Sequence, residues 1–152
     1  MISEHISKKE ATFSATASRK GIDNIPGEYE LQNMELIAVK VFEPLRKAVN
    51  GPIKINSFFR SEELNKAIGG SSRSQHCQGR AMDLDDTYGY MSNKDMYNYI
   101  KNNLDFDQMI WEFGTDQNPD WVHVSYVDGD SNRRRCLQAY KDDNNKTCYK
   151  EI

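Results

Sequence analysis

The segment from Ser71 to Asp86, SSRSQHCQGRAMDLDD, places His76 and Asp83 seven positions apart around Gly79. A second histidine, His123, lies in the later segment WVHVSYV. Two imidazole nitrogens and a carboxylate oxygen, with a fourth position left open, form the ligand set of catalytic rather than structural zinc sites. Together these residues would predict a zinc centre. Taken separately, each histidine is more simply explained as an ordinary loop or strand residue.

Two expected strands carry two of these side chains. The segments RAMDLDD, residues 80–86, and WVHVSYV, residues 121–127, both alternate in the period of a β-strand. The alternation turns Asp83 away from the apolar side of its own strand and gives His123 a defined face. His76 precedes the first strand in a loop that Gly79 makes pliable, so its side chain can fold back toward Asp83.

The remaining periodic segments predict the frame around these strands. Apolar residues spaced by three and four predict a helix from Leu31 to Val49, and Pro44 predicts a bend or a break near Glu43. Further expected elements are strands at 53–59 and 106–113, a short helix from Ser61 to Ala67, and a helix near 93–103 opened by a Ser92–Asp95 capping box. This order predicts one α+β domain over residues 1–152, a small antiparallel sheet flanked by helices.

Composition excludes several classes of partner. The 152 residues carry a net charge of −3 with both signs interspersed, which predicts no nucleic-acid partner. No apolar run reaches the length of a signal peptide or a membrane span, so we expect the protein to be made in the cytoplasm and to have no membrane partner. We also expect it to be a monomer. The three cysteines are expected to be free thiols, and the run Arg133–Arg135 is interpreted as a solvated strand edge.

The segment SQHCQGRAMD, residues 74–83, resembles the S-x-H-x-x-G-x-A-x-D signature of the zinc D-alanyl-D-alanine peptidases, whose fold is shared with the hedgehog signalling domain. The segments SFFRSEELNKAIGGSS, FDQMIWEFG and NPDWVHVSY are also similar to that family, particularly to its small phage and bacterial members. The likeness extends from about Glu10 to Tyr140. It implies that His76, Asp83 and His123 bind Zn²⁺.

A zinc peptidase of this kind also needs a carboxylate that takes a proton from water and passes it to the leaving amine. Asp120 lies three residues before His123, which resembles the acidic-x-x-His arrangement of many family members, and we take it as the general acid/base. Glu112, on the adjacent expected strand, is the alternative. In that case Asp120 would simply cap the turn after Pro119.

Two further residues match family positions, Arg60 an arginine that faces the site and Ser74 the serine of the signature. Arg60 is expected to hold the substrate carboxylate or the developing oxyanion through its planar fork, although a surface ion pair with Glu62 or Glu63 is the simpler role. Ser74 is expected to hydrogen-bond substrate or to stabilise its loop. The aromatic rings of Trp111 and Trp121 either wall the cleft or belong to the core.

The resemblance implies a zinc peptidase that hydrolyses bonds in peptidoglycan stem peptides, either as a D,D-carboxypeptidase or as an endopeptidase. The expected absence of an export signal suits a phage endolysin that reaches the cell wall after release by a separate membrane-permeabilising protein. The alternative is a non-catalytic, zinc-stabilised domain that binds cell-wall peptide or a protein. A weaker alternative is a cytoplasmic dipeptidase acting on D-Ala-D-Ala itself.

Overall fold

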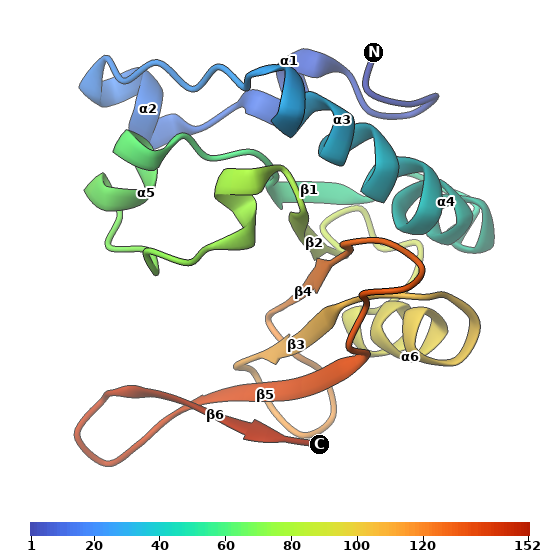
Figure 1. Ribbon diagram of the computed structural model, residues 1–152. Helices are drawn as coiled ribbons and strands as arrows, with labels where there is room; N and C mark the ends of the chain where they lie inside the picture. The colour runs from blue at the N-terminus through green and yellow to red at the C-terminus, as the bar shows by residue number, and fades with distance from the viewer.

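A computed structural model describes residues 1–152 (Figure 1). The helical elements are α1 (Lys8–Thr12), α2 (Ala15–Lys20), α3 (Glu28–Ile37), a π-helical turn η1 (Ala38–Phe42), α4 (Glu43–Val49), α5 (Glu62–Ala67), a 3₁₀ turn η2 (Gln75–Gln78) and α6 (Asn93–Asn103). The strands are β1 (Lys54–Ser57), β2 (Ala81–Asp85), β3 (Gln108–Glu112), β4 (Trp121–Ser125), β5 (Arg135–Lys141) and β6 (Thr147–Glu151).

The strands form one sheet in the order β1-β2-β4-β3-β5-β6. Every neighbouring pair is antiparallel except β3 and β5, which run parallel. The predicted α+β class is therefore confirmed, with a sheet that is larger than expected and contains one parallel pair. The sequence analysis did not predict β5 or β6, because charged residues at both ends of β5 and at the end of β6 obscure the short apolar alternation.

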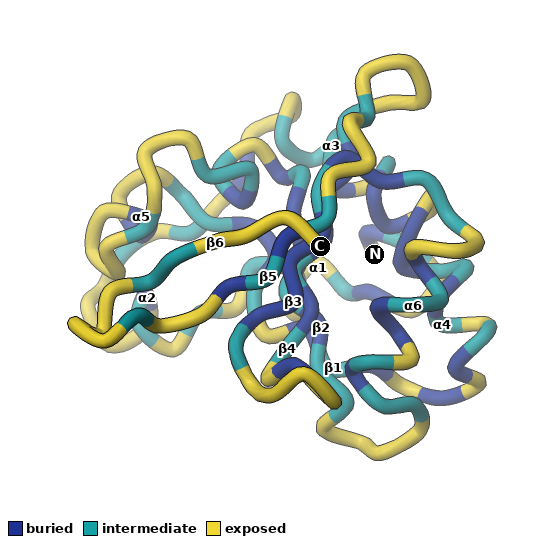
Figure 2. Tube along the Cα trace, turned by 90° about the horizontal axis from the view of Figure 1, so that it is seen from below, coloured by how far each residue is buried: buried dark blue, intermediate teal, exposed yellow.

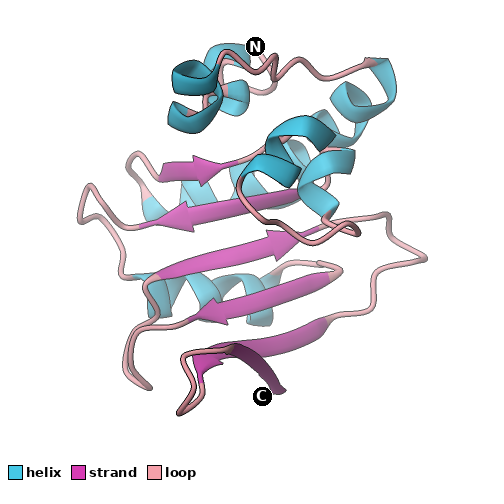
Figure 3. Cartoon of the chain, turned by 90° about the vertical axis from the view of Figure 1, so that its left-hand side faces the viewer, coloured by secondary structure: helices cyan, strands magenta, loops and turns pink.

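The two faces of the sheet differ sharply in their surroundings. Helices α3, α4 and α6 lie behind the sheet in Figure 3, while the near face of the lower strands is uncovered. The covered face buries the apolar side chains Met82, Leu84, Met109, Trp111, Val122 and Val124 in one cluster with residues of these helices. The uncovered face is where the strands present the polar side chains described below.

The long helix predicted from Leu31 to Val49 stays helical throughout but changes type in its middle. In the π-helical turn η1 the amide of Glu43 donates to the carbonyl of Ala38, five residues back. Pro44 then lies in the first turn of α4, where its missing N–H needs no partner. The irregularity lies where it was predicted, near Glu43, and the helix continues because the wider turn accommodates the proline.

Serine side chains define the starts of several helices. Ser61 and Ser92, both predicted as helix starts, accept hydrogen bonds from the amides of Leu64 and Asp95.

The central strands are buried, whereas β6 is mostly exposed, as Figure 2 shows along the chain. None of the helices combines the length and the apolar composition that a transmembrane segment requires.

Candidate metal centre

Strand register brings Asp83 and His123 together. The two residues are direct partners in the antiparallel pair β2–β4, and both face the uncovered side of the sheet. The Nδ1 atom of His123 lies 2.9 Å from Oδ1 of Asp83. Because neighbouring strands in a sheet are about 5 Å apart, this pairing places two donor groups at ligand spacing without any loop movement.

His76 reaches the same point from the 3₁₀ turn η2. Its Nε2 atom lies 3.4 Å from Oδ2 of Asp83, and its side chain is only 2 % exposed. Its Nδ1 atom lies 2.7 Å from the carbonyl oxygen of Phe58, which can only accept a hydrogen bond. The proton must therefore reside on Nδ1, and the lone pair of Nε2 is directed into the site.

The donor atoms of His76, Asp83 and His123 all lie within 4.8 Å of one another. Burial lowers the pKa of His76 despite the neighbouring Asp83, so the imidazole is neutral. Burial alone would raise the pKa of Asp83, but the contacts with His76 and His123 outweigh it and hold that pKa well below its ordinary range. A neutral imidazole and an ionised carboxylate are the forms that bind metal, so these residues fit zinc.

The three donors lie in a cleft of about 740 Å³ on the uncovered face of the sheet. Strands β2 to β6, the turn η2 and the loop that precedes it line this cleft. The polar and charged lining residues include Arg60, Arg73, Ser74, Gln75, His76, Asp83, Gln108, Glu112, His123, Arg133 and Tyr149. A cleft of this size accommodates a short peptide.

The two candidate bases occupy different places. Glu112 lines the cleft and is 8 % exposed, and burial raises the pKa of its carboxyl to about 7, with Asp83 adding to the rise and His123 opposing it. Asp120 is exposed and does not line the cleft. It lies in the bend before β4, and its backbone amide donates to the carbonyl of Glu112. The geometry therefore favours the alternative, Glu112.

Arg60 and Ser74 both line the cleft, next to the metal donors. The Nη2 atom of Arg60 lies 3.4 Å from Oγ of Ser74, and the buried Nε atom of Arg60 has no hydrogen-bond partner. Neither Glu62 nor Glu63 forms an ion pair with Arg60. The Arg60 guanidinium thus has no carboxylate partner within the protein. The Ser74 hydroxyl also accepts from the amide of His76, which caps η2.

Of the two tryptophans, one lines the cleft and the other lies in the core. Trp121 lines the cleft, with its ring centroid 5.6 Å from that of Phe113. Trp111 belongs to the core, where its indole N–H donates to the carbonyl of Thr115.

The comparison with known families agrees with this geometry. The family model described as Peptidase M15 matches residues 4–125. The chain belongs to the Peptidase M15 family. Membership makes the protein a metallopeptidase, and Peptidase M15 members are generally zinc-dependent. Among curated proteins no significant match was found.

The Peptidase M15 match contains His76, Asp83, His123 and Glu112, and it ends at Ser125, the last residue of β4. The strands β5 and β6 therefore lie beyond it. The chain beyond the match adds cleft-lining residues to which the sequence analysis gave no role in the site, namely Arg133 in the segment before β5, Leu137 in β5, and Thr147 and Tyr149 in β6. Only Arg133 had been considered, as part of a solvated edge, and nothing in the sequence indicated which carboxylate it would meet.

Proposed function

We propose that this protein is a zinc-dependent peptidase that hydrolyses peptide bonds in peptidoglycan stem peptides, as a D,D-carboxypeptidase or as an endopeptidase. The observation that carries the proposal is the group of His76, Asp83 and His123 on the wall of a peptide-sized cleft that also contains Glu112. Peptidoglycan lies outside the membrane. The protein would therefore act after release from the cell that makes it, as a phage endolysin does.

His76 through Nε2, Asp83 and His123 through Nδ1 would hold the zinc. When bound, zinc supplies Lewis acidity toward the scissile carbonyl and makes water more acidic. The carboxylate of Glu112 accepts the proton that the attacking water loses, and then delivers it to the nitrogen of the leaving amine. Its raised pKa suits this exchange, because a shuttle works best when its pKa is near the working pH.

Arg60 contributes to binding and to stabilising negative charge. Its guanidinium lines the cleft, has no carboxylate partner in the protein, and fits a substrate carboxylate or the oxyanion that develops at the carbonyl. Ser74 keeps the η2 turn capped and orients Arg60 through the contact at 3.4 Å. Substrate hydrogen bonding by the Ser74 hydroxyl is a second role that this position allows.

The test is digestion of purified peptidoglycan with identification of the new termini by mass spectrometry. Zinc-loaded protein should release a new amine and a new carboxylate, and chelation should stop the reaction. His76→Ala and His123→Ala should lose zinc and activity together. His5→Ala is the matched control, because His5 pairs with Glu43 outside the cleft. If zinc-loaded protein bound peptidoglycan but released no amine, the non-catalytic binding domain would replace the peptidase.

A further inference from the structure

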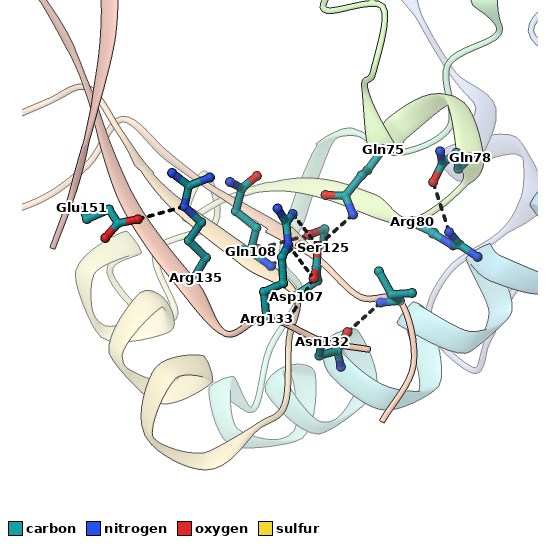
Figure 4. Close-up of polar contacts among 11 residues, drawn as sticks. Gln75, Gln78, Arg80, Asp107, Gln108, Ser125, Asn132, Arg133, Arg135 and Glu151 are labelled. Atoms are coloured by element: carbon teal, nitrogen blue, oxygen red, sulfur yellow. Dashed lines mark hydrogen bonds and ion pairs between the residues drawn. The ribbon is translucent and has the colours of Figure 1, made fainter. Parts of the chain in front are cut away.

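Arg133 is held at one end of the cleft by a buried carboxylate. Its Nε atom lies 3.0 Å from Oδ1 of Asp107 and its Nη2 atom 2.8 Å from Oδ2, a bidentate pair (Figure 4). Asp107 is 1 % exposed and also accepts from the backbone amide of Arg133 and from Nε2 of Gln75. Gln75 precedes the metal donor His76, so this network is attached to the turn that carries part of the site.

In this network the guanidinium of Arg133 keeps N–H groups without a partner, whereas the carboxylate of Asp107 has no free acceptor position. Asp107 receives four hydrogen bonds, two at each oxygen, which fills its acceptor capacity. A guanidinium carries five N–H groups, and only two of those of Arg133 have a partner in the protein. The side chain is 53 % exposed and lines the cleft. Three N–H groups are therefore fixed in direction and available to a ligand.

The position of Arg133 relative to the metal donors follows from strand register. Ile110 of β3 is the direct partner of His123, and Asp107 lies three residues before it along the chain. At about 3.3 Å per residue, Arg133 is displaced by roughly 10 Å from the level of the metal donors. An extended peptide covers that distance in about three residues.

We propose that Arg133 is a specificity residue that binds a carboxylate of the substrate away from the scissile bond, so that the cleft prefers acidic peptides. The inference rests on the proposed peptidase function and names its substrate class. A fork already immobilised by Asp107 loses little side-chain entropy on binding a carboxylate, and a planar guanidinium matches that group better than a flexible ammonium does. Arg133 lies beyond the segment that the family model matches and lines the cleft.

The test uses pairs of synthetic stem peptides that differ only in whether one carboxylate is free or amidated, each carboxylate being changed in turn. With wild-type, zinc-loaded protein, kcat/KM should be roughly tenfold or more higher for the free acid at one position, as expected for a lost charge-assisted hydrogen bond. In Arg133→Gln that ratio should fall to about one, while cleavage of the amidated peptide changes by less than about threefold. A purely structural role would lower both peptides alike.

Arg134→Gln is the matched control. It removes the same charge one residue along, but Arg134 donates to the carbonyls of Lys101 and Leu104 and does not line the cleft, so the acid preference should persist. If Arg133→Gln fails to fold, Arg133→Lys supplies a cation for Asp107 without a fork and should show the same lost preference.

The dissociation constants of the same peptide pairs, measured by calorimetry, separate this inference from the proposed function. Equal affinity and equal turnover for every pair would overturn the role of Arg133 and leave the peptidase standing. Preferential binding of one acid without any cleavage would support the role of Arg133 and overturn the peptidase. Loss of the preference in Arg134→Gln as well as in Arg133→Gln would also overturn the inference, because general charge would then be the cause.

Discussion

At the scale of single residues, the proposed proton shuttle is one of two carboxylates that lie close together in sequence. Glu112→Gln keeps the shape of the side chain and all three metal donors but removes the basic oxygen. We expect zinc to remain bound while turnover of stem peptides falls by roughly a hundredfold or more, as is usual when general acid/base catalysis is lost. Elemental analysis together with initial rates would check both parts.

Asp120→Asn provides the control, because this exposed side chain lies outside the cleft. It should retain zinc and turn over substrate within about threefold of wild type. The reverse pattern, with Asp120→Asn inactive and Glu112→Gln active, would return the proton shuttle to the acidic-x-x-His position that the sequence first indicated.

The raised pKa of Glu112 also predicts a change in stability with pH. The folded protein holds this carboxyl with a pKa of about 7, above the ordinary 4.5, so the unfolded chain releases its proton first. Its contribution to stability is full below about pH 4.5 and is lost as the pH rises through 7. In metal-free protein, Glu112→Gln should therefore raise the free energy of unfolding at pH 8, by up to about 3 kcal/mol, and change it little at pH 4.

Denaturant unfolding at both pH values, in the presence of a chelator, would measure this difference. Asp120→Asn should show no comparable gain at pH 8. An equal effect of Glu112→Gln at pH 4 and pH 8 would mean that ionisation of the buried carboxyl is not its cause.

At the scale of elements, the η2 turn positions His76 and depends on Gly79. Gly79 has a φ of 73°, and a Cβ there would overlap the carbonyl oxygen of Glu30 in helix α3. Gly79→Ala should therefore lower the free energy of unfolding by more than about 1 kcal/mol and weaken zinc binding, because the turn must move away from the helix. Gly129→Ala is the control, since no atom lies within 4 Å of the added carbon. Equal zinc affinity in both variants would contradict this role.

The elements also show what a sequence can predict. Strands β2 and β4 and helix α6 were predicted nearly to their ends, because alternation or a serine cap marks each of them locally. Strands β5 and β6 were missed, since β5 depends on its pairing with β3 and β6 on its pairing with β5. His76 and Asp83 were predicted as metal ligands from a local signature, and His123 from a separate segment that is similar to the family. The choice between Glu112 and Asp120 as the general base depended on which of the two carboxylates lines the cleft, and only the tertiary structure shows this.

At the scale of the whole molecule, Asp107 holds the segment that connects β4 to β5, because its carboxylate accepts hydrogen bonds from Arg133 in that segment. Burial alone would raise the pKa of Asp107, but hydrogen bonds from Arg133 and Gln75 lower it below its ordinary value. A lowered pKa gives stability that is present above about pH 4, where the unfolded carboxyl is ionised, and lost as the pH falls through the folded value. Asp107→Asn should therefore cost about 2 kcal/mol near pH 7 and progressively less in acid.

Thermal unfolding between pH 3 and pH 7 would follow this difference. The gap in melting temperature between wild type and Asp107→Asn should be widest at neutral pH. A gap that stayed constant down to pH 3 would show that packing around residue 107, rather than its charge, accounts for the loss.

The pairing of Asp83 with His123 has a consequence for the order of events in folding. These two donors are 40 residues apart in sequence, and a slip of one residue between β2 and β4 would turn His123 to the other face of the sheet. We therefore expect high affinity for the ion only after the long-range strand pairing is in register. Zinc should therefore leave the refolding rate nearly unchanged and slow the unfolding rate. The ion would then stabilise the completed sheet of the native state, and would not take part in the nucleus from which the sheet folds.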